Sequence, residues 1–217
     1  MRPLVSFVLA GLCAGVLFTA TAEAKTDAAG DFLATHAGPN NADLDIVQAN
    51  VFNFGSALGF TARFDGKIGQ TTGASYVWGI DRGAGTPGLF AGTPPVGAQV
   101  TFDAVLVLRA DGTGTVTAFN EVGAPTVTSL QNGVASFRSF LGALVDTSLL
   151  PSRGFAVQDY RYNLWTRSGG GNAGIADLAQ GSGTFGAVPE PATWAMMIGG
   201  FAMTGWRTRR RAKRVLA

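Results

Sequence analysis

Acidic side chains near the N-terminus are the first residues of this 217-residue chain whose types suit a chemical role. Carboxylates on flexible segments are the hard oxygen ligands that calcium accepts. Their spacing is not that of an EF-hand loop, so two interpretations stay open, a structural calcium site and ordinary solvated turns. The candidate ligands are Asp27, Asp31, Asp43 and Asp45. No other cofactor is expected.

Five aromatic residues form a second candidate site. Aromatic rings with a few polar groups beside them can stack on sugars, which would make the protein a polysaccharide-binding module. The same rings can instead fill the core between two sheets, and this is the preferred interpretation. The residues concerned are Tyr76, Trp78, Tyr160, Tyr162 and Trp165.

The sequence contains no recognisable catalytic motif. His36 is the only histidine, and we interpret it as an exposed residue of a segment rich in Gly, Pro and Asn. No Gly-x-Ser-x-Gly nucleophile motif occurs, and the only cysteine, Cys13, lies in an apolar N-terminal run. The aspartates mostly occupy turns, where Asp is favoured locally. The sequence therefore predicts a protein that is not an enzyme.

The elements that must position these residues are predicted to be β-strands. Apolar residues alternate in Leu58–Phe64, which suits a strand with one buried face. Val100–Leu108 begins in alternation and becomes continuously apolar, as expected of a central strand. Asp111–Gly114 is a turn signal, and Thr115–Phe119 is the expected returning strand.

The predicted fold class is mainly β, an antiparallel, jelly-roll-like β-sandwich with an N-terminal signal helix and a C-terminal transmembrane helix. Phe155–Trp165 is a further expected strand, whereas Val134–Leu150 fits one helix or two short strands. The predicted organisation is a signal peptide (1–24), a sandwich body (25–178), a linker (179–188) and a sorting segment (189–214).

The N-terminus has the pattern of a secretory signal peptide. Arg2 precedes an apolar run at 4–20, and the small residues Ala22 and Ala24 stand at the −3 and −1 positions of a cleavage site. The alternative, an N-terminal membrane anchor, would need a longer apolar run. We therefore expect cleavage after Ala24.

Charge is segregated along the chain. Residues 25–187 carry nine basic and twelve acidic side chains, a net charge of −3, although the whole chain has a formal charge of +2. The surplus of positive charge belongs to a C-terminal cluster made of Arg207, Arg209, Arg210, Arg211, Lys213 and Arg214. The basic isoelectric point is therefore no indication of nucleic-acid binding.

Three features follow one another at the C-terminus. Pro189, Glu190 and Pro191 come first, and an apolar segment at 192–206 follows, which includes Trp194. At 1.5 Å per residue its 15 residues make a helix of about 22 Å, which is short for a hydrocarbon core of roughly 30 Å. The basic cluster comes last and is expected to stay in the cytoplasm, which places the body across the inner membrane.

Residues 188–214 resemble the PEP-CTERM sorting signal, in its Pro-Glu-Pro-Ala-x-x-Trp variant. The resemblance implies recognition by an exosortase, cleavage near the motif and transfer to the cell surface, in systems that accompany exopolysaccharide and biofilm production. Such a tail is also named the ice-binding protein C-terminal domain, although nothing in its residues implies ice binding. The alternative is an ordinary tail anchor that is never cut.

Two functions remain for the body. The first is that of an exported, non-catalytic surface or matrix protein, whose partners are the exosortase and the inner membrane. The second is that of a module that binds extracellular polysaccharide, assisted by calcium. The body otherwise resembles only uncharacterised domains.

Overall fold

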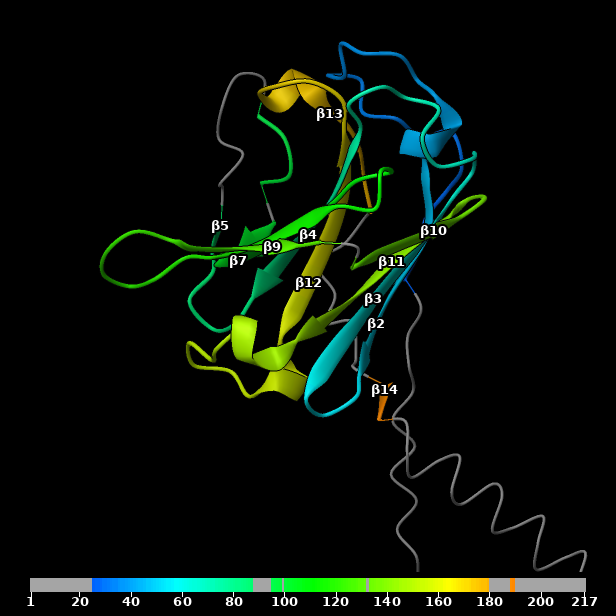
Figure 1. The fold of residues 1–217 in the computed structure, drawn as a ribbon. Coiled ribbons are helices and arrows are strands. Elements are labelled where there is room, and N and C mark those ends of the chain that lie inside the picture. Colours follow the sequence, from blue (N-terminus) through cyan, green and yellow to red (C-terminus); the bar gives the residue numbers. More distant parts are fainter. Residues whose placement is uncertain (1–24, 88–94, 99, 132, 180–187, 190–217) are drawn as a thin grey trace, which may run out of the picture.

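The structure, a computed structural model, describes residues 25–87, 95–98, 100–131, 133–179 and 188–189. The predicted signal peptide and sorting helix lie outside these residues, as does most of the predicted linker. The described chain is mainly β and forms two six-stranded sheets and a small two-stranded ladder (Figure 1). The predicted β-rich, antiparallel body is therefore confirmed.

Sheet I has the strand order β1-β2-β3-β11-β10, and β14 pairs with the end of β2. All its pairs are antiparallel except that of β14 with β2. Short hairpins join β2 to β3 and β10 to β11. The strands are β1 (Lys25–Thr26), β2 (Ile46–Asn53), β3 (Ala57–Phe64), β10 (Val134–Phe137), β11 (Phe140–Asp146) and β14 (Val188–Pro189).

Sheet II has the order β13-β12-β4-β7-β8-β9 and is antiparallel throughout. Beside it, β5 (Thr86–Pro87) pairs with β6 (Thr101–Phe102). The strands of sheet II are β4 (Ser75–Asp81), β7 (Ala104–Leu108), β8 (Gly114–Ala118), β9 (Thr126–Leu130), β12 (Arg161–Arg167) and β13 (Ile175–Leu178).

The helical structure of the described chain consists of short 3₁₀ turns. They are η1 (Ala42–Leu44), η2 (Thr147–Leu149), η3 (Val157–Asp159) and η4 (Asn172–Gly174). Among the described residues, no helix has the length and apolar character that crossing a membrane requires.

The inner faces of the two sheets meet in one hydrophobic core. Phe60 of β3 in sheet I lies edge-on to Trp78 of β4 and to Tyr162 of β12, with ring centroids 5.4 and 5.7 Å apart. Phe64 contacts Tyr76 in a tilted arrangement, with ring centroids 4.8 Å apart. Alternate residues of β3 and β4 thus face each other, as the period of two in these segments predicts.

The five aromatic residues considered as a sugar platform are all buried. Each has at most 3% of its surface exposed, so the platform interpretation is wrong, and the core interpretation is confirmed for Tyr76, Trp78, Tyr160 and Tyr162. Trp165 differs from the others because it lies on the opposite face of sheet II. There it packs against Phe102, with ring centroids 5.4 Å apart, beneath the segment that leads into β6.

Two segments differ from their predicted form. Val100–Leu108 is not one strand, because it breaks at Asp103, whose side chain turns inward to bind Arg82. In Phe155–Trp165 the strand begins only at Arg161, because η3 occupies the polar stretch before it. The ambiguous segment Val134–Leu150 takes the strand alternative, as β10 and β11.

Candidate metal centre

Three carboxylates converge at one end of the molecule. Asp27 and Asp31 come from the N-terminal segment and Asp177 from β13, and one oxygen of each lies within 4.8 Å of the other two. Two backbone hydrogen bonds hold the segment in place: Asp27 N donates to Val47 O at 3.0 Å and Leu33 N to Ala176 O at 2.9 Å. These two bonds join the N-terminal segment to β2 of sheet I and to β13 of sheet II.

Asp177 is the buried member of the cluster, with 1% of its surface exposed. Its Oδ2 accepts a hydrogen bond from Ile46 N and its Oδ1 one from Leu178 N, both at 2.7 Å. Burial raises the pKa of Asp177 to about 7, against the two hydrogen bonds that lower it, and the charges of Asp27 and Asp31 raise it further. The ionised form of this carboxyl lacks a compensating positive charge within the cluster.

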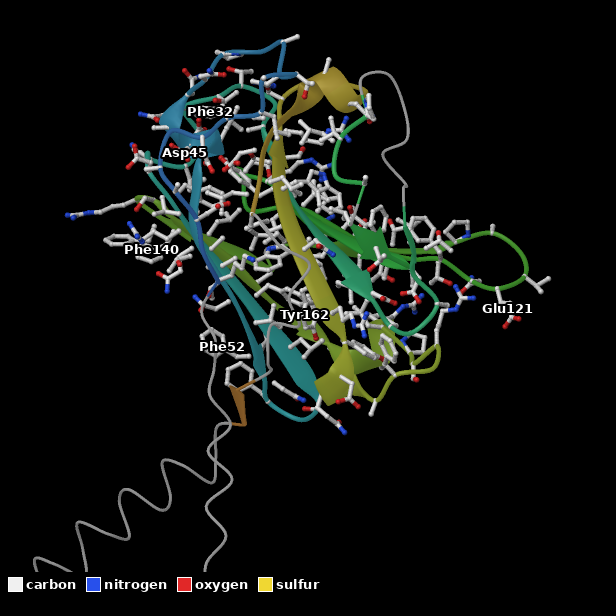
Figure 2. The ribbon with its side chains drawn as sticks, turned by 180° about the vertical axis from the view of Figure 1, so that it is seen from behind. Phe32, Asp45, Phe52, Glu121, Phe140 and Tyr162 are labelled. Carbon is white, nitrogen blue, oxygen red and sulfur yellow. The ribbon has the colours of Figure 1, made fainter. Side chains whose placement is uncertain are left out.

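Asp45 lies beside this cluster, at the end of the molecule that carries the N-terminal segment (Figure 2). It is 2% exposed, and its Oδ2 accepts a hydrogen bond from Gly30 N at 2.6 Å. Its Oδ1 is buried and has no hydrogen-bond partner, as is also the case for Oδ1 of Asp31. Burial raises the pKa of Asp45, and the nearby charges of Asp65 and Asp31 act in the same direction.

These groups fit a hard divalent cation. Carboxylate oxygens are the ligands of calcium, and a cation would supply both the missing positive charge and a partner for the unpaired oxygens. Of the four predicted ligands, the structure brings Asp27 and Asp31 together and places Asp45 next to them. Asp177 was missed because it is about 150 residues away from Asp27 and Asp31 along the chain. The one sign of its role in the sequence is that it is a charged residue within the otherwise apolar run 175–179.

Asp43 is not part of this cluster, which the structure builds from Asp27, Asp31 and Asp177. Its oxygens accept hydrogen bonds from Thr71 N at 2.8 Å, from Thr71 Oγ1 at 2.6 Å and from Tyr76 Oη at 3.3 Å. The turn η1 points Asp43 into the core beside β4, whereas Asp45, past the end of the turn, reaches Gly30. Both carboxylate oxygens of Asp43 are thus hydrogen-bonded, and they hold the 71–76 segment against η1.

His36 is not the exposed loop residue that the sequence suggested. It is half-buried, with Nδ1 3.2 Å from the carbonyl oxygen of Ala173, while its Nε2 is buried without a hydrogen-bond partner. Its ring packs close to Gly38 and Ser168. The histidine therefore ties the N-terminal segment to the turn before β13.

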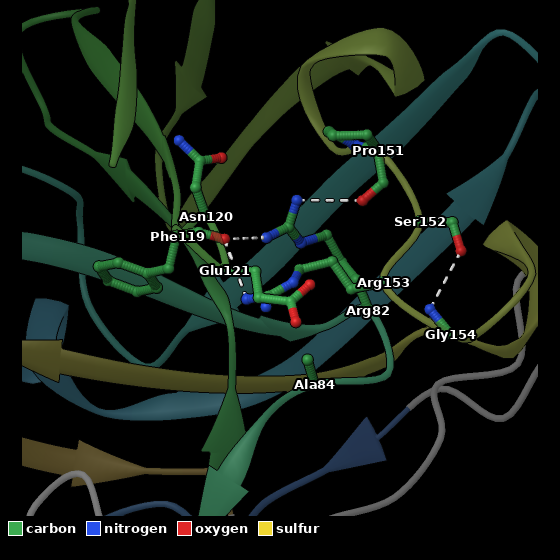
Figure 3. A pocket seen from close by; sticks show the side chains of 9 residues that line it. All are labelled: Arg82, Ala84, Phe119, Asn120, Glu121, Pro151, Ser152, Arg153 and Gly154. Carbon is green, nitrogen blue, oxygen red and sulfur yellow. Dashed lines mark hydrogen bonds between the residues drawn. The ribbon is translucent and has the colours of Figure 1, made fainter. Parts of the chain in front are cut away.

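An open pocket of about 530 Å³ lies at the opposite end of sheet II (Figure 3). Arg82 Nη2 donates to the carbonyl oxygen of Phe119 at 2.9 Å, and Arg153 Nη1 donates to the same oxygen at 3.1 Å. Asn120, Glu121 and Ser152 line the rim. The guanidinium of Arg82, which lines this pocket, already donates hydrogen bonds to groups of the protein itself.

Arg82 is the hub of a buried network. It is 1% exposed and forms an ion pair with Asp103, with Nε 2.8 Å from Oδ1. Nη1 donates to Pro151 O at 3.0 Å, and Nη2 donates to the carbonyl oxygen of Asp103 at 2.8 Å. Asp103 in turn accepts from the backbone N–H groups of Arg82 and Ala84. The network fixes three loops, a structural role.

No known protein family matches this chain, and no curated protein is significantly similar to it.

Proposed function

We propose that this chain is an exported, non-catalytic cell-surface or matrix protein, sorted by an exosortase through residues 189–214. The observation that carries the proposal is the order of three features: the Pro189–Pro191 motif, the apolar segment 192–206 and the basic cluster. The prolines keep the motif irregular and open to an enzyme, and the apolar segment holds it at the membrane face. The basic cluster resists export and stops the chain there.

The body in this proposal is a β-sandwich, and its jelly-roll-like connectivity stays a prediction. Val188 and Pro189 pair with Phe52 and Asn53 at the end of β2, so the sorting motif begins directly at the edge of sheet I. The signal peptide and the membrane helix belong to the proposal as the sequence predicts them. The sorting enzyme would thus meet its motif beside the folded body.

Replacing Glu190 with alanine tests the sorting function. In cells that contain the exosortase, the wild-type chain is expected to lose a C-terminal epitope tag. The Glu190→Ala chain is expected to keep the tag and to stay in the membrane fraction, because the enzyme no longer recognises its motif. Immunoblots of fractionated cells measure both. The matched control is Glu121→Ala, since Glu121 is an exposed glutamate of the body.

A second arm of this experiment concerns the stop-transfer signal. Neutral residues in place of Arg209, Arg210, Arg211, Lys213 and Arg214 are expected to release the protein unanchored and unprocessed. If Glu190→Ala loses its tag as fast as the wild type, sorting is refuted and only a tail anchor is left.

A bound calcium ion that stabilises the body is the second part of the proposal. Asp27, Asp31 and Asp177 would hold the ion, and Asp45 would lie beside it. The convergence of three carboxylates around a buried one, next to an unpaired buried oxygen of Asp45, supports this assignment. Such an ion would fasten the N-terminal segment to β13 and so rigidify one end of the sandwich.

Calcium is expected to raise the melting temperature of the protein. At a concentration 100 times the Kd, a ligand of the native state stabilises it by about 2.7 kcal/mol, which corresponds to roughly 5–10 °C for a domain of this size. Differential scanning calorimetry of the full chain in detergent, with calcium or with a chelator, measures the shift.

Asp31→Asn is the informative variant for this site. Oδ1 of Asp31 has no hydrogen-bond partner in the structure, so the change relieves repulsion without breaking a bond at that atom. We expect the calcium-free variant to melt no lower than the wild type and to show no response to calcium. Asp159→Asn, at an exposed aspartate away from the cluster, should respond like the wild type. A calcium response that survives in Asp31→Asn would leave these aspartates as turn residues.

The second candidate function, binding of extracellular polysaccharide, is favoured by one observation. The buried aromatic residues cannot serve it, but a different set of aromatic side chains lies exposed on the outer face of sheet I.

A further inference from the structure

The outer face of sheet I has large apolar side chains that the described part of the chain leaves exposed. Phe137 in β10 is 69% exposed, and Phe140 and Leu144 in β11 are 50% and 61% exposed. Figure 2 shows Phe140 directed away from the molecule, whereas Tyr162 lies between the sheets. Large apolar side chains that gather on an exposed face are typical of interaction surfaces.

The outer face of sheet II provides the contrast. There Val96, Val100 and Phe102 form a buried cluster with Val77 and Trp165 of the sheet. Within the described ranges, the chain therefore covers the outer face of sheet II with its own residues and leaves large apolar side chains of sheet I exposed. Strand β11 is apolar on both faces, a pattern typical of a strand that is covered on both sides.

The register of the strands defines the rows of side chains on the open face. Directly paired residues lie on the same face of a sheet. Phe137 pairs with Phe140, Phe140 with Arg63, and Arg63 with Gln48, which makes one row across four strands. With strands about 4.8 Å apart, this row is about 14 Å long. Two aromatic rings, a guanidinium and an amide thus follow one another in a line.

The neighbouring row has small and polar side chains. Gly142 pairs with Thr61, and Thr61 pairs with Asn50. A Cβ atom at Gly142 would lie 2.7 Å from the carbonyl oxygen of Phe60, so no larger residue fits there without a shift. Beside the row of Phe137, Phe140, Arg63 and Gln48, the face therefore has no side chain at Gly142 and hydrogen-bonding side chains at Thr61 and Asn50.

Positive charge accompanies the aromatic rings. The guanidinium of Arg138 lies over the ring of Phe137, 5.4 Å from its centroid. Arg138 adopts a φ of +54°, which is uncommon for a residue other than glycine and places its side chain beside the row. The first two rows contain Arg63 but no carboxylate, although the body as a whole is acidic.

We propose that this face binds a linear, uronate-bearing polysaccharide. The apolar faces of two sugar rings stack on Phe137 and Phe140, as aromatic side chains allow. Arg63 and Arg138 pair with sugar carboxylates, and the side chains of Thr61 and Asn50 in the neighbouring row bind hydroxyl groups. The inference rests on the second candidate function, names its site and its ligand class, and is independent of sorting.

Charge complementarity favours this ligand over two other occupants. A second copy of the chain, packed face to face, would bring the arginines of both copies onto one interface, where like charges repel. A lipid surface is bound by protruding apolar groups that enter the bilayer, whereas the rings on this face share their rows with the polar side chains of Gln48, Thr61 and Asn50. A polymer of sugar rings with carboxylates along its length fits this row, because its apolar ring faces can stack on the phenylalanines and its carboxylates can pair with the arginines.

The test uses polygalacturonate and its methyl ester, a neutral form of the same polymer. Binding to the full chain in detergent is measured by affinity electrophoresis in the presence of a chelator, so that calcium plays no part. The wild type should bind polygalacturonate more tightly than the ester, and added salt should weaken that binding. Phe140→Ala should weaken the binding of both polymers about tenfold. Arg63→Gln should remove the preference for the charged polymer.

Matched controls come from sheet II and its neighbourhood. Arg161→Gln is the control for Arg63→Gln, because Arg161 is an arginine of β12 in sheet II that also lies near an aromatic ring, 5.2 Å from the centroid of Phe155. Val127→Thr is the control for Phe140→Ala, because Val127 is an exposed apolar residue of β9. Both controls should bind like the wild type, and unchanged circular dichroism spectra exclude misfolding of the variants.

Three outcomes overturn the proposal. The first is binding of polygalacturonate that neither Phe140→Ala nor Arg63→Gln changes, or no binding at all. The second is a dimer in analytical ultracentrifugation that Phe140→Ala dissociates, without binding of the polymer. The third is binding to phosphatidylglycerol vesicles through Phe140 in place of the polymer. None of them affects the result of the Glu190→Ala experiment, so failure of this site and failure of sorting are distinguishable.

Discussion

Arg82→Met is expected to lower the free energy of unfolding by about 3–5 kcal/mol, because it removes one partner of a buried ion pair. Both residues of the pair are almost fully buried, and Asp103 has no other cation in the network. The variant also leaves the carbonyl oxygens of Pro151 and Phe119 without the donor that Arg82 supplies. Urea denaturation of the full chain, followed by tryptophan fluorescence, measures the loss.

Arg153→Met is the matched control for this variant. Arg153 lines the same pocket and donates to the same Phe119 oxygen, but it is only half-buried and forms no ion pair within the described residues. The expected loss is about 1 kcal/mol, the usual net contribution of one hydrogen bond. A similar loss in both variants would show that the ion pair with Asp103 contributes little.

The second large effect is a dependence of stability on pH. The folded-state pKa of Asp177 is about 7 and lies above its ordinary value of 3.8, because the carboxyl is buried. Between these two values the folded state holds a proton that the unfolded state releases. In calcium-free buffer, stability is therefore expected to be highest near pH 4 to 5 and to fall as the pH rises through 7. At 1.36 kcal/mol for each pH unit, this fall reaches up to about 4 kcal/mol.

The slope should disappear in Asp177→Asn, which cannot ionise. Asparagine has one acceptor oxygen for two backbone donors, Ile46 N and Leu178 N, so this variant should be less stable than the wild type at pH 5. Above pH 5 its free energy of unfolding should not change with pH. Saturating calcium should reduce the slope in the wild type, because a cation favours the ionised carboxylate. Urea titrations between pH 4 and 8 measure these effects, with Asp159→Asn as the control. If stability depends on pH as steeply in Asp177→Asn as in the wild type, the dependence comes from other groups, among them Asp45.

The strands were predictable from the sequence wherever one face of the strand is buried and the other is exposed to solvent. In Leu58–Phe64 the apolar residues alternate, and the structure has β3 there with its alternate side chains in the core. The turn at Asp111 is also as predicted, since its side chain accepts from Thr113 N at 2.9 Å, a contact between near neighbours in sequence. Such patterns are local, so they can be read without knowledge of the remaining chain.

The break at Asp103 shows where such reading fails. The run Val100–Leu108 looks like one strand, and the reason for its interruption, the guanidinium of Arg82, lies in another strand. The 134–150 segment was ambiguous for a related reason, because short apolar runs fit helix and strand alike. Pairing of β11 with β3, which is far away in sequence, decided for the strand.

By itself the sequence determined the β-rich class of the body and the burial of its five aromatic residues, because hydrophobic period and turn chemistry are local properties; its targeting signals stay predictions. The tertiary structure alone decided which groups meet. It replaced Asp43 with Asp177 beside Asp27 and Asp31, since η1 turns Asp43 inward and β13 returns to the N-terminal segment. Among the residues that the structure describes, it also left Phe137, Phe140 and Leu144 of sheet I exposed, while the segment before β7 covered the outer face of sheet II. Both results depend on which strands become neighbours and in which register, and long-range packing sets that choice.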